Sequence, residues 1–245
     1  MDGASPITFE VSTPAADLQA HIDHALSLGL PEADSKQKTL NLIANGPSAN
    51  DIPWADLKGD TMALNGSIAL FGPRGPTYWI GCDPQASLSQ FLHNAPKNTV
   101  YLIASKCHKD VFDVLLTQRR MIRLWHVTDV PIPGKRQVPC AVSVTLCAMM
   151  LANRLGYRRI DVWGWDCCFK GEEHHAGPGT LSTTPDRRFI EVGDGPNSKH
   201  FESTATWACE AKDASGILPV LRWCGTDVFI HGGGMMAAIL EDYAA

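Results

Sequence analysis

Apolar residues gather in short runs that alternate with longer stretches of helical periodicity from Thr39 to the end of the chain. Short apolar runs separated by helices are typical of an α/β fold with a largely parallel sheet flanked by helices. We expect strands at residues 39–44, 61–64, 77–82, 99–104, 121–126, 159–163 and 218–223. We expect helices between them at residues 51–57, 84–93, 109–119, 141–155, 203–214 and 234–243.

The part of the chain before this alternation contains one expected helix. Thr13 is a suitable N-cap, Pro14 fits the first helical position, and apolar side chains then recur on one face. We therefore divide the chain into an N-terminal helical appendage, residues 1–38, and a main domain, residues 39–245. Within that domain, residues 171–200 form the one long irregular region, and loops of such length are usually functional or disordered.

Composition narrows the class of protein. The 245 residues are 44% hydrophobic and 19% charged with a net charge of −5, which supports a packed core and argues against disorder and against a nucleic-acid clamp. The chain has neither an apolar run of about 20 residues nor a recognisable secretory signal at its start, so we expect a cytoplasmic protein that does not bind membranes. The eight cysteines include no C-x-x-C pair, which disfavours both a disulfide scaffold and a zinc site.

Two Asn-Gly turns follow expected strands. Asn45-Gly46-Pro47-Ser48 comes directly after the first strand, and Asn65-Gly66 comes after the second. Ligands of open α/β sheets bind outside the carboxyl ends of the strands, so both turns are predicted to reach one crevice. A glycine turn that opens a helix suits a phosphate, whereas the alternative is a pair of ordinary turns.

Acidic residues follow two further strands. Asp83 ends the third strand, where it could hold Mg²⁺ or cap the following helix. Asp166 follows the strand 159–163, and His174 and His175 come soon after it, a set suited to general acid-base catalysis. The alternatives are a zinc site formed by these histidines with Cys167-Cys168, and a surface loop with incidental histidines.

The run His231-Gly232-Gly233-Gly234 precedes the last expected helix. Three glycines permit an anion nest or a close approach of the backbone to a ligand. A flexible turn before the last helix is the plainer explanation of these glycines.

Taken in order, these motifs resemble the MptE-like 6-hydroxymethylpterin diphosphokinase family. The resemblance rests on Asn45-Gly46-Pro47-Ser48, Asn65-Gly66, Cys82-Asp83-Pro84, Leu155-Gly156-Tyr157, Trp163-Gly164-Trp165-Asp166-Cys167 and His175-Ala176. The same domain forms the core of the motility-associated flagellin glycosyltransferases. The layout is also similar to that of the bacterial CMP-sialic acid transferases, although Cys168 and His175 stand where those enzymes have tyrosines.

This resemblance implies a Rossmann-like, nucleotide-binding transferase domain. It implies ATP as the co-substrate, Mg²⁺ as the cofactor, and diphosphate transfer to a hydroxymethyl acceptor such as a pterin. Asn45, Gly46, Pro47, Ser48, Asn65 and Gly66 would bind the nucleotide, Asp83 and Asp166 would hold the metal, and Asp166, His174 and His175 would be catalytic.

Two alternatives stay open at this point. The first is a glycosyltransferase that uses a CMP-sugar and needs no metal, and the second is a non-catalytic nucleotide-binding module. The sequence leaves open the acceptor, the base of the nucleotide, the pathway and whether the chain forms a homo-oligomer.

Overall fold

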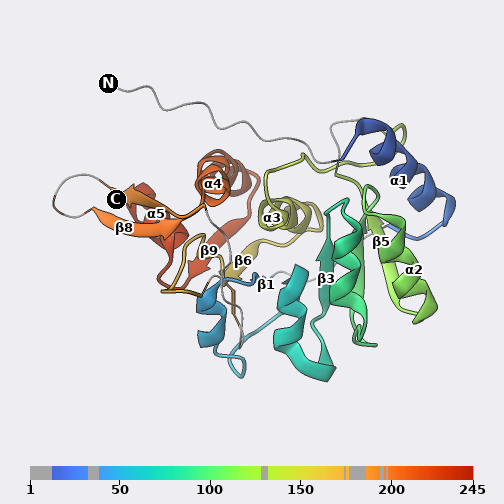
Figure 1. Cartoon of the computed structure of the whole chain (residues 1–245), viewed down its shortest axis with the longest axis horizontal. Helices are drawn as coiled ribbons and strands as arrows, with labels where there is room; N and C mark the ends of the chain where they lie inside the picture. Colours follow the sequence, from blue (N-terminus) through green and yellow to red (C-terminus); the bar gives the residue numbers. More distant parts are fainter. Residues whose placement is uncertain are drawn as a thin grey trace.

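A computed structural model describes residues 13–32, 39–127, 132–173, 175–176, 186–193, 196 and 198–244. Its centre is a seven-stranded sheet in the order β5-β4-β3-β2-β1-β6-β9, and every neighbouring pair is parallel (Figure 1). The strands are β1 (Thr39–Ile43), β2 (Asp60–Leu64), β3 (Tyr78–Gly81), β4 (Val100–Ala104), β5 (Met121–Trp125), β6 (Arg159–Trp163) and β9 (Asp227–His231). The α/β, Rossmann-like layout is therefore confirmed.

The direction in which the chain builds the sheet reverses at β1. Strands β2 to β5 extend the sheet on one side of β1, and β6 and β9 extend it on the other. In such sheets the connections before and after the reversal leave on opposite faces, which opens a crevice at the carboxyl ends of the two central strands. The segments after β1 and β6 are therefore the places where this fold positions a ligand.

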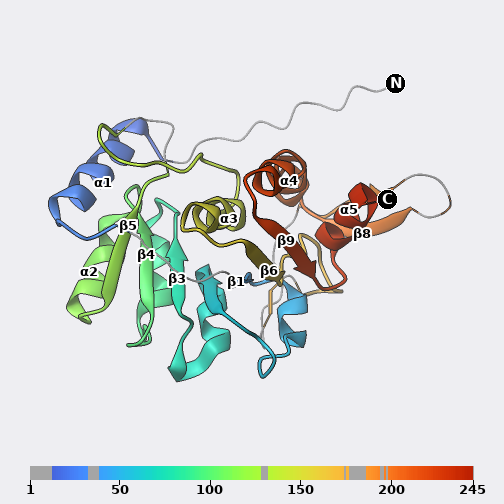
Figure 2. The same cartoon turned by 180° about the vertical axis from the view of Figure 1, so that it is seen from behind.

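Helices cover both faces of the sheet. Helices α3 (Val144–Arg154) and α4 (Ala205–Trp223) lie above it in Figure 1, and the short helices η1 (Pro47–Asp51) and η2 (Asn65–Arg74) lie below it, as the reverse view in Figure 2 also shows. The remaining helices are η3 (Ala86–Leu92), α2 (Lys109–Thr117) and α5 (Met235–Ala244).

Helix α3 is the central helix of the core. Seven of its eleven residues are buried, in keeping with a stretch that is apolar on nearly every side. Its first turn is fixed by Ser143, whose hydroxyl accepts a hydrogen bond from the Leu146 amide at 3.3 Å. Thr204 caps α4 in the same way through the Trp207 amide, at 3.2 Å. The loops before α3 and α4 are thus held firmly where they meet the sheet.

The N-terminal helix α1 (Ala15–Ser27) packs beside α2 near the β5 edge of the sheet. The His24 ring contacts the Phe112 ring edge to face, and the Leu124 amide donates to the Pro31 carbonyl at 2.8 Å. The expectation that Thr13 caps this helix is wrong, because its hydroxyl instead accepts a hydrogen bond from Gln85 at 3.2 Å.

Two expectations about the C-terminal half are wrong. Residues 218–223, expected as a strand, complete α4, because Ala214, Leu218 and Leu221 recur with the period of one helix face. The last strand is β9 instead. Within residues 171–200, expected as irregular, lies most of the hairpin of β7 (Arg188–Val192) and β8 (Lys199–Ser203), which buries too little to show a clear strand pattern.

The expected helices at residues 51–57 and 84–93 correspond to 3-10 turns, η1 a few residues earlier and η3 at nearly the expected place. In the described part of the chain, no helix combines the length and apolar character needed to cross a membrane.

Candidate functional site

A cavity of about 670 Å³ opens at the carboxyl ends of β1, β2 and β6. The segments after these strands form its floor, and the first turns of α3 and α4 form a wall. Its volume lies within the range of small-molecule binding sites. The lining residues are Ala44, Asn45, Gly46, Leu64, Asn65, Gly66, Ala69, Leu70, Phe91, Ser143, Val144, Thr145, Gly164, Trp165, Asp166, Cys167, Cys168, His175, Ala176, Trp207 and Glu210.

Asp166 is the acidic group at the centre of this site. Its side chain is buried, with 5% of the residue exposed, and its Oδ2 accepts a hydrogen bond from the Ser48 amide at 2.8 Å. Burial raises the pKa of Asp166 above its usual range, although the hydrogen bond from the Ser48 amide and the charge of Lys170 oppose the shift. A carboxylate with a raised pKa is a stronger base, which suits the abstraction of a proton from a hydroxyl group.

Glycines surround Asp166 because the chain segments approach one another too closely for side chains. A Cβ atom on Gly46 would lie 2.5 Å from Asp166 Oδ2 and 2.5 Å from the Gly164 carbonyl oxygen. A Cβ on Gly234 would lie 2.5 Å from the Asp166 Cα, and one on Gly232 would lie 2.6 Å from the Ser48 Oγ. The glycine run after β9 is therefore explained by close backbone packing at two of its three positions.

The Asn45-Gly46-Pro47-Ser48 turn has a structural role that its sequence did not reveal. The Gly46 amide donates to the Gly164 carbonyl at 2.7 Å, and the Ser48 amide donates to Asp166. Pro47 is buried at the start of η1. These amides hold the ends of β1 and β6 together, so the proposed contact of Gly46 and Ser48 with a nucleotide stays a prediction.

The two Asn-Gly turns meet in the cavity. The Asn45 carbonyl accepts a hydrogen bond from the Ala176 amide at 2.7 Å, which joins this turn to the loop after β6. Asn65 adopts a left-handed conformation with φ of 47°, and Trp79 Nε1 donates to its carbonyl at 2.9 Å. The Asn65 Oδ1 atom is buried without a hydrogen-bond partner among the described residues. Asn65 can therefore accept a hydrogen bond from a ligand.

The structure brings His175 to the cavity but not Asp83. Asp83 is exposed, and its carboxylate accepts a hydrogen bond from the Gln85 amide at 2.8 Å. It follows β3, three strands away from Asp166 after β6, which corresponds to about 14 Å at the usual strand spacing. His174 lies outside the described residues.

A metal site formed by Asp83 together with Asp166 therefore does not fit this geometry. Among the described residues, no group of three or more His, Cys, Asp and Glu side chains is arranged to hold a metal ion. Cys167 and Cys168, considered above as zinc ligands, are buried, and burial raises the pKa of both thiols, which disfavours the thiolate that zinc requires.

Glu210 is a buried acidic residue of the cavity lining that the sequence analysis missed. It lies on α4 with 6% of the residue exposed, and its Oε1 accepts a hydrogen bond from Trp165 Nε1 at 2.6 Å. Burial raises the pKa of Glu210 even though Ser143, Trp165, Cys167 and Thr145 hydrogen-bond to it. Glu210 lies on the buried face of α4, together with Ala211 and Ala214. In the sequence alone, a glutamate at such a position cannot be distinguished from one that faces solvent.

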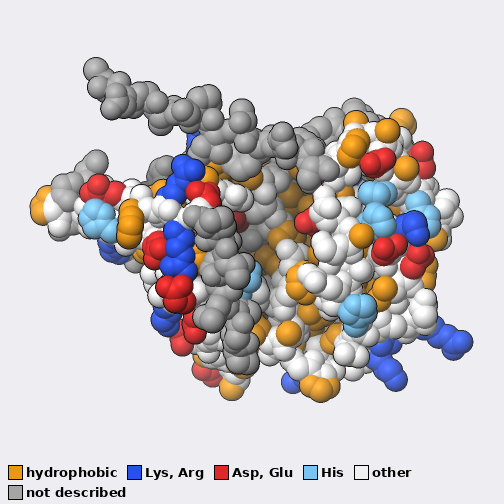
Figure 3. Space-filling model, in the orientation of Figure 1, with side chains coloured by type: hydrophobic (Ala, Val, Ile, Leu, Met, Phe, Trp, Pro, Cys, Tyr) orange, Lys and Arg blue, Asp and Glu red, His pale blue; other side chains and the backbone are white. Residues whose placement is uncertain are grey.

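The cavity contains two carboxyl groups and no lysine or arginine among its described lining residues. Figure 3 shows Lys and Arg side chains at the lower edge of the molecule and also on the surface to the left of the central hollow, next to Asp and Glu side chains. The walls instead carry the aromatic side chains of Phe91, Trp165 and Trp207. The cavity thus suits the planar ring of a ligand, and the charge of a bound phosphate would have to be neutralised by groups other than these lining residues.

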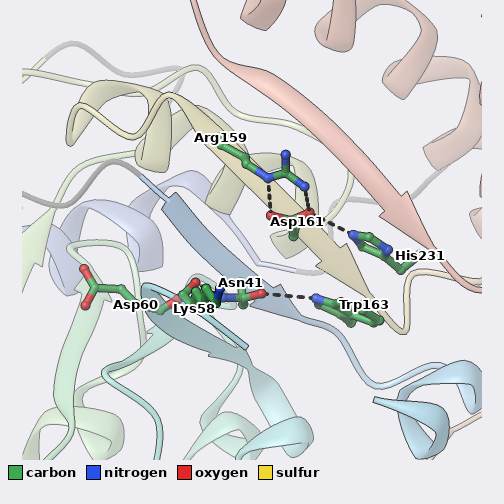
Figure 4. A network of polar contacts seen from close by, with 7 residues as sticks. All are labelled: Asn41, Lys58, Asp60, Arg159, Asp161, Trp163 and His231. Atoms are coloured by element: carbon green, nitrogen blue, oxygen red, sulfur yellow. Dashed lines mark hydrogen bonds and ion pairs between the residues drawn. The ribbon is translucent and has the colours of Figure 1, made fainter. Parts of the chain in front are cut away.

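A separate polar network occupies β1, β6 and β9 (Figure 4). Asp161 accepts two hydrogen bonds from Arg159, at 2.7 and 2.8 Å, and one contact of 2.8 Å joins its Oδ1 to His231 Nε2. The His231 ring stacks on Trp163 with 3.9 Å between ring centroids. Burial opposes ionisation of Asp161, but the bonds from Arg159 and His231 prevail and lower its pKa. This network ties the central strands together and does not line the cavity.

No protein-family model, curated protein sequence or solved structure matches this chain. The fold, the cavity and the residue motifs therefore carry the functional proposal.

Proposed function

We propose that this chain is a nucleotide-dependent transferase that moves a group from a bound nucleotide to a hydroxyl acceptor. Its leading form is diphosphate transfer from ATP to a hydroxymethyl acceptor such as a pterin, as the MptE-like resemblance implies. The observation that carries the proposal is the cavity at the reversal point of the sheet, where both Asn-Gly turns and Asp166 converge.

The side chains around the cavity have complementary roles in this proposal. The aromatic walls pack against the planar ring of a nucleoside or acceptor, and Asn65 Oδ1 accepts a hydrogen bond from that ring or from a sugar. Asp166 takes the proton of the acceptor hydroxyl as the hydroxyl oxygen bonds to the transferred group. The bond between that group and the nucleotide breaks, and its electron pair leaves with the nucleotide. The Ser48 amide keeps the Asp166 carboxylate oriented for this step.

The two candidate donors, ATP and a CMP-sugar, differ in how much phosphate charge the site has to neutralise. ATP carries several negative charges, and the described lining residues include no lysine or arginine and no group of three or more side chains arranged to hold a metal ion. A CMP-sugar carries a single phosphate and needs no metal for transfer. The lack of lysine and arginine among the described lining residues is the observation that favours a CMP-sugar glycosyltransferase as the second candidate.

Calorimetric titration with ATP and with CMP, each with and without Mg²⁺, separates these donors. Tighter binding of ATP in the presence of Mg²⁺ supports diphosphate transfer, whereas CMP binding that is independent of Mg²⁺ supports the glycosyltransferase. If neither nucleotide binds, the proposal is wrong. Binding without product formation on any hydroxyl acceptor would instead indicate a non-catalytic nucleotide-binding module.

The Asp166→Asn variant tests the catalytic role. It keeps the size of the side chain and removes the base, so transfer should fall by about 10²- to 10⁴-fold while nucleotide affinity changes little. Asp83→Asn is the matched control, because Asp83 also follows a strand but does not line the cavity, and it should leave transfer unchanged. Unchanged transfer in Asp166→Asn, or equal losses in both variants, would contradict the assignment.

A further inference from the structure

Three cysteines and one lysine meet beside the first turn of α3. Cys82 follows β3, Lys106 follows β4, and Cys140 and Cys147 lie before and within the start of α3. Lys106 Nζ donates to Cys140 Sγ at 3.6 Å. The thiols of Cys140 and Cys147 both donate to the Ala141 carbonyl oxygen, at 3.8 and 3.9 Å. The two sulfur atoms therefore approach one carbonyl oxygen, and Cys140 and Cys82 are both near enough to Cys147 to shift its pKa.

The members of this cluster differ in accessibility. Cys140 is exposed, whereas Cys82 and Cys147 are buried. An oxidant in solution therefore reaches Cys140 first, with a protonated lysine on one side and a second thiol on the other. Thiolates next to a lysine ammonium are the reactive form of cysteine in proteins.

The electrostatics of Lys106 agree with this arrangement. Burial lowers the pKa of Lys106, but the neighbouring thiol groups of Cys82, Cys140 and Cys147 outweigh burial and raise it. Cys147 remains protonated at neutral pH: its hydrogen bond with Cys140 lowers its pKa, but the bond with Cys82 and burial raise it to about 12.

We infer that Cys140 and Cys147 form an oxidant-sensitive thiol pair that closes to a disulfide when the protein meets a hydroperoxide. The Cys140 thiolate attacks one oxygen of hydrogen peroxide, the O–O bond breaks, and the products are a sulfenic acid and, after protonation, water. The Cys147 sulfur then attacks the Cys140 sulfur, the S–O bond breaks, and the leaving hydroxide takes the Cys147 proton to form a second water. Both sulfurs are oxidised, and both peroxide oxygens are reduced.

The segment enclosed by this disulfide contains part of the cavity wall. Ser143, Val144 and Thr145 line the cavity and lie between the two cysteines in the sequence. The pair therefore stands where oxidation would constrain that wall. The inference rests on the cluster itself and does not depend on the proposed transferase activity.

Peptide mapping of the oxidised full-length protein tests the pairing. The reduced protein is treated with hydrogen peroxide, free thiols are blocked with N-ethylmaleimide, and the protein is digested with trypsin without reduction. Cys140 and Cys147 lie in a single tryptic peptide, residues 137–154, and Cys82 lies in another, residues 75–97. We expect the mass of the peptide 137–154 to be lower by two hydrogen atoms than that of its reduced form, and we expect this peptide to carry no maleimide. A link between the two peptides, or an alkylated Cys147 beside an overoxidised Cys140, overturns the inference.

The rate of thiol labelling tests the role of Lys106. Cys224 is the other exposed cysteine and serves as the internal reference for iodoacetamide labelling at neutral pH. We expect Cys140 to react about tenfold faster than Cys224, because the Lys106 ammonium lies 3.6 Å from the Cys140 sulfur and an adjacent ammonium activates a thiol. Lys106→Met should remove most of this advantage, and Lys109→Met, at an exposed lysine on α2, should not. Equal labelling of Cys140 and Cys224 in the natural sequence overturns the inference.

The single variants complete the test. Cys224→Ser should leave the disulfide yield unchanged, and Cys147→Ala should leave Cys140 as a sulfenic acid that dimedone captures. A disulfide that forms in the absence of Cys147, or no dimedone adduct on Cys140 in this variant, counts against the pairing. The mapping of the natural sequence decides the question even if Cys147→Ala does not fold.

Discussion

Replacing Gly46 with alanine should disturb the site through the contacts of a single new methyl group. The backbone of Gly46 has φ of −70° and ψ of 163°, which alanine adopts without strain, so the whole effect comes from the contacts of the new Cβ. That atom would lie 2.5 Å from both Asp166 Oδ2 and the Gly164 carbonyl oxygen. Both oxygens must retreat by about 0.9 Å to reach an ordinary contact of 3.4 Å.

The cost follows from the two hydrogen bonds that this retreat breaks. The Gly46 amide bonds the Gly164 carbonyl at 2.7 Å, and the Ser48 amide bonds the Asp166 carboxylate at 2.8 Å. A neutral bond contributes about 1 kcal/mol and a bond to a charged group about 1.5–3 kcal/mol, so the expected loss is roughly 2–4 kcal/mol. At about 2–4 °C per kcal/mol for a chain of this size, the melting temperature should fall by roughly 5–15 °C.

Thermal and urea unfolding followed by circular dichroism measure this change, with Gly233→Ala as the matched control. Gly233 lies in the glycine run near the site, outside the left-handed region, and a Cβ there would meet nothing within 4 Å. Its variant should be at least as stable as the natural protein, because alanine also restricts the unfolded chain. About 1 kcal/mol is a typical uncertainty when unfolding free energies of two variants are compared. If the unfolding free energies of Gly46→Ala and Gly233→Ala differ by less than this, the close packing of β1 and β6 around Asp166 is refuted.

Three further predictions concern stability. Gly216→Ala, at an exposed position inside α4 with nothing within 4 Å of a new Cβ, should raise the unfolding free energy by about 0.5–1 kcal/mol, and a decrease in urea denaturation would contradict this. Burial raises the pKa of Glu210 in the folded protein above its value in the unfolded chain, so the natural protein loses stability as pH rises through this interval. The Glu210→Gln variant has no carboxyl group there, so its free energy of unfolding should increase relative to that of the natural protein over the same interval. The gain should be about 1.4 kcal/mol for each tenfold difference between the acid dissociation constants of the folded and unfolded states, and a stability difference that does not change between pH 4 and 8 would refute it. Asp161→Asn should lower the free energy of unfolding by about 1–3 kcal/mol at pH 7, because it removes a carboxylate that Arg159 and His231 stabilise. This loss should become smaller as the pH falls through the lowered pKa of Asp161, because the natural protein then loses the same carboxylate. Unfolding midpoints measured from pH 7 to pH 3 test the direction of this change.

Six of the seven strands of the sheet could be predicted from the sequence, because strands buried on both faces appear as uninterrupted apolar runs between turns. Residues 218–223 were expected to form a strand but are the end of α4, and this error had a specific cause. An apolar stretch of this length is equally compatible with a buried helix end, and Pro219 does not stop α4. The hairpin of β7 and β8 was missed because its side chains are mostly exposed or half-buried and give little period-two pattern.

The candidate site was predictable in part. The Asn45 and Asn65 turns and Asp166 follow strands, and the edge of a parallel sheet brings strand ends together whatever the side chains are. Asp83 also follows a strand, but it lies on the far side of β2 and β1 from Asp166. Position at a strand end was therefore a sound guide to the edge of the sheet and a poor guide to the cavity.

The sequence by itself determined the parallel α/β architecture and the strand ends from which the site is built, because these depend on local hydrophobic periodicity and on turn residues. Only the tertiary structure decided which distant groups touch. Ser48 and Asp166 are 118 residues apart, and Trp165 and Glu210 are 45 residues apart, yet each pair is joined by a hydrogen bond. The environment of Asp166, the burial of Glu210 and the meeting of Cys140 with Lys106 all arise from such contacts, which no local pattern in the chain encodes.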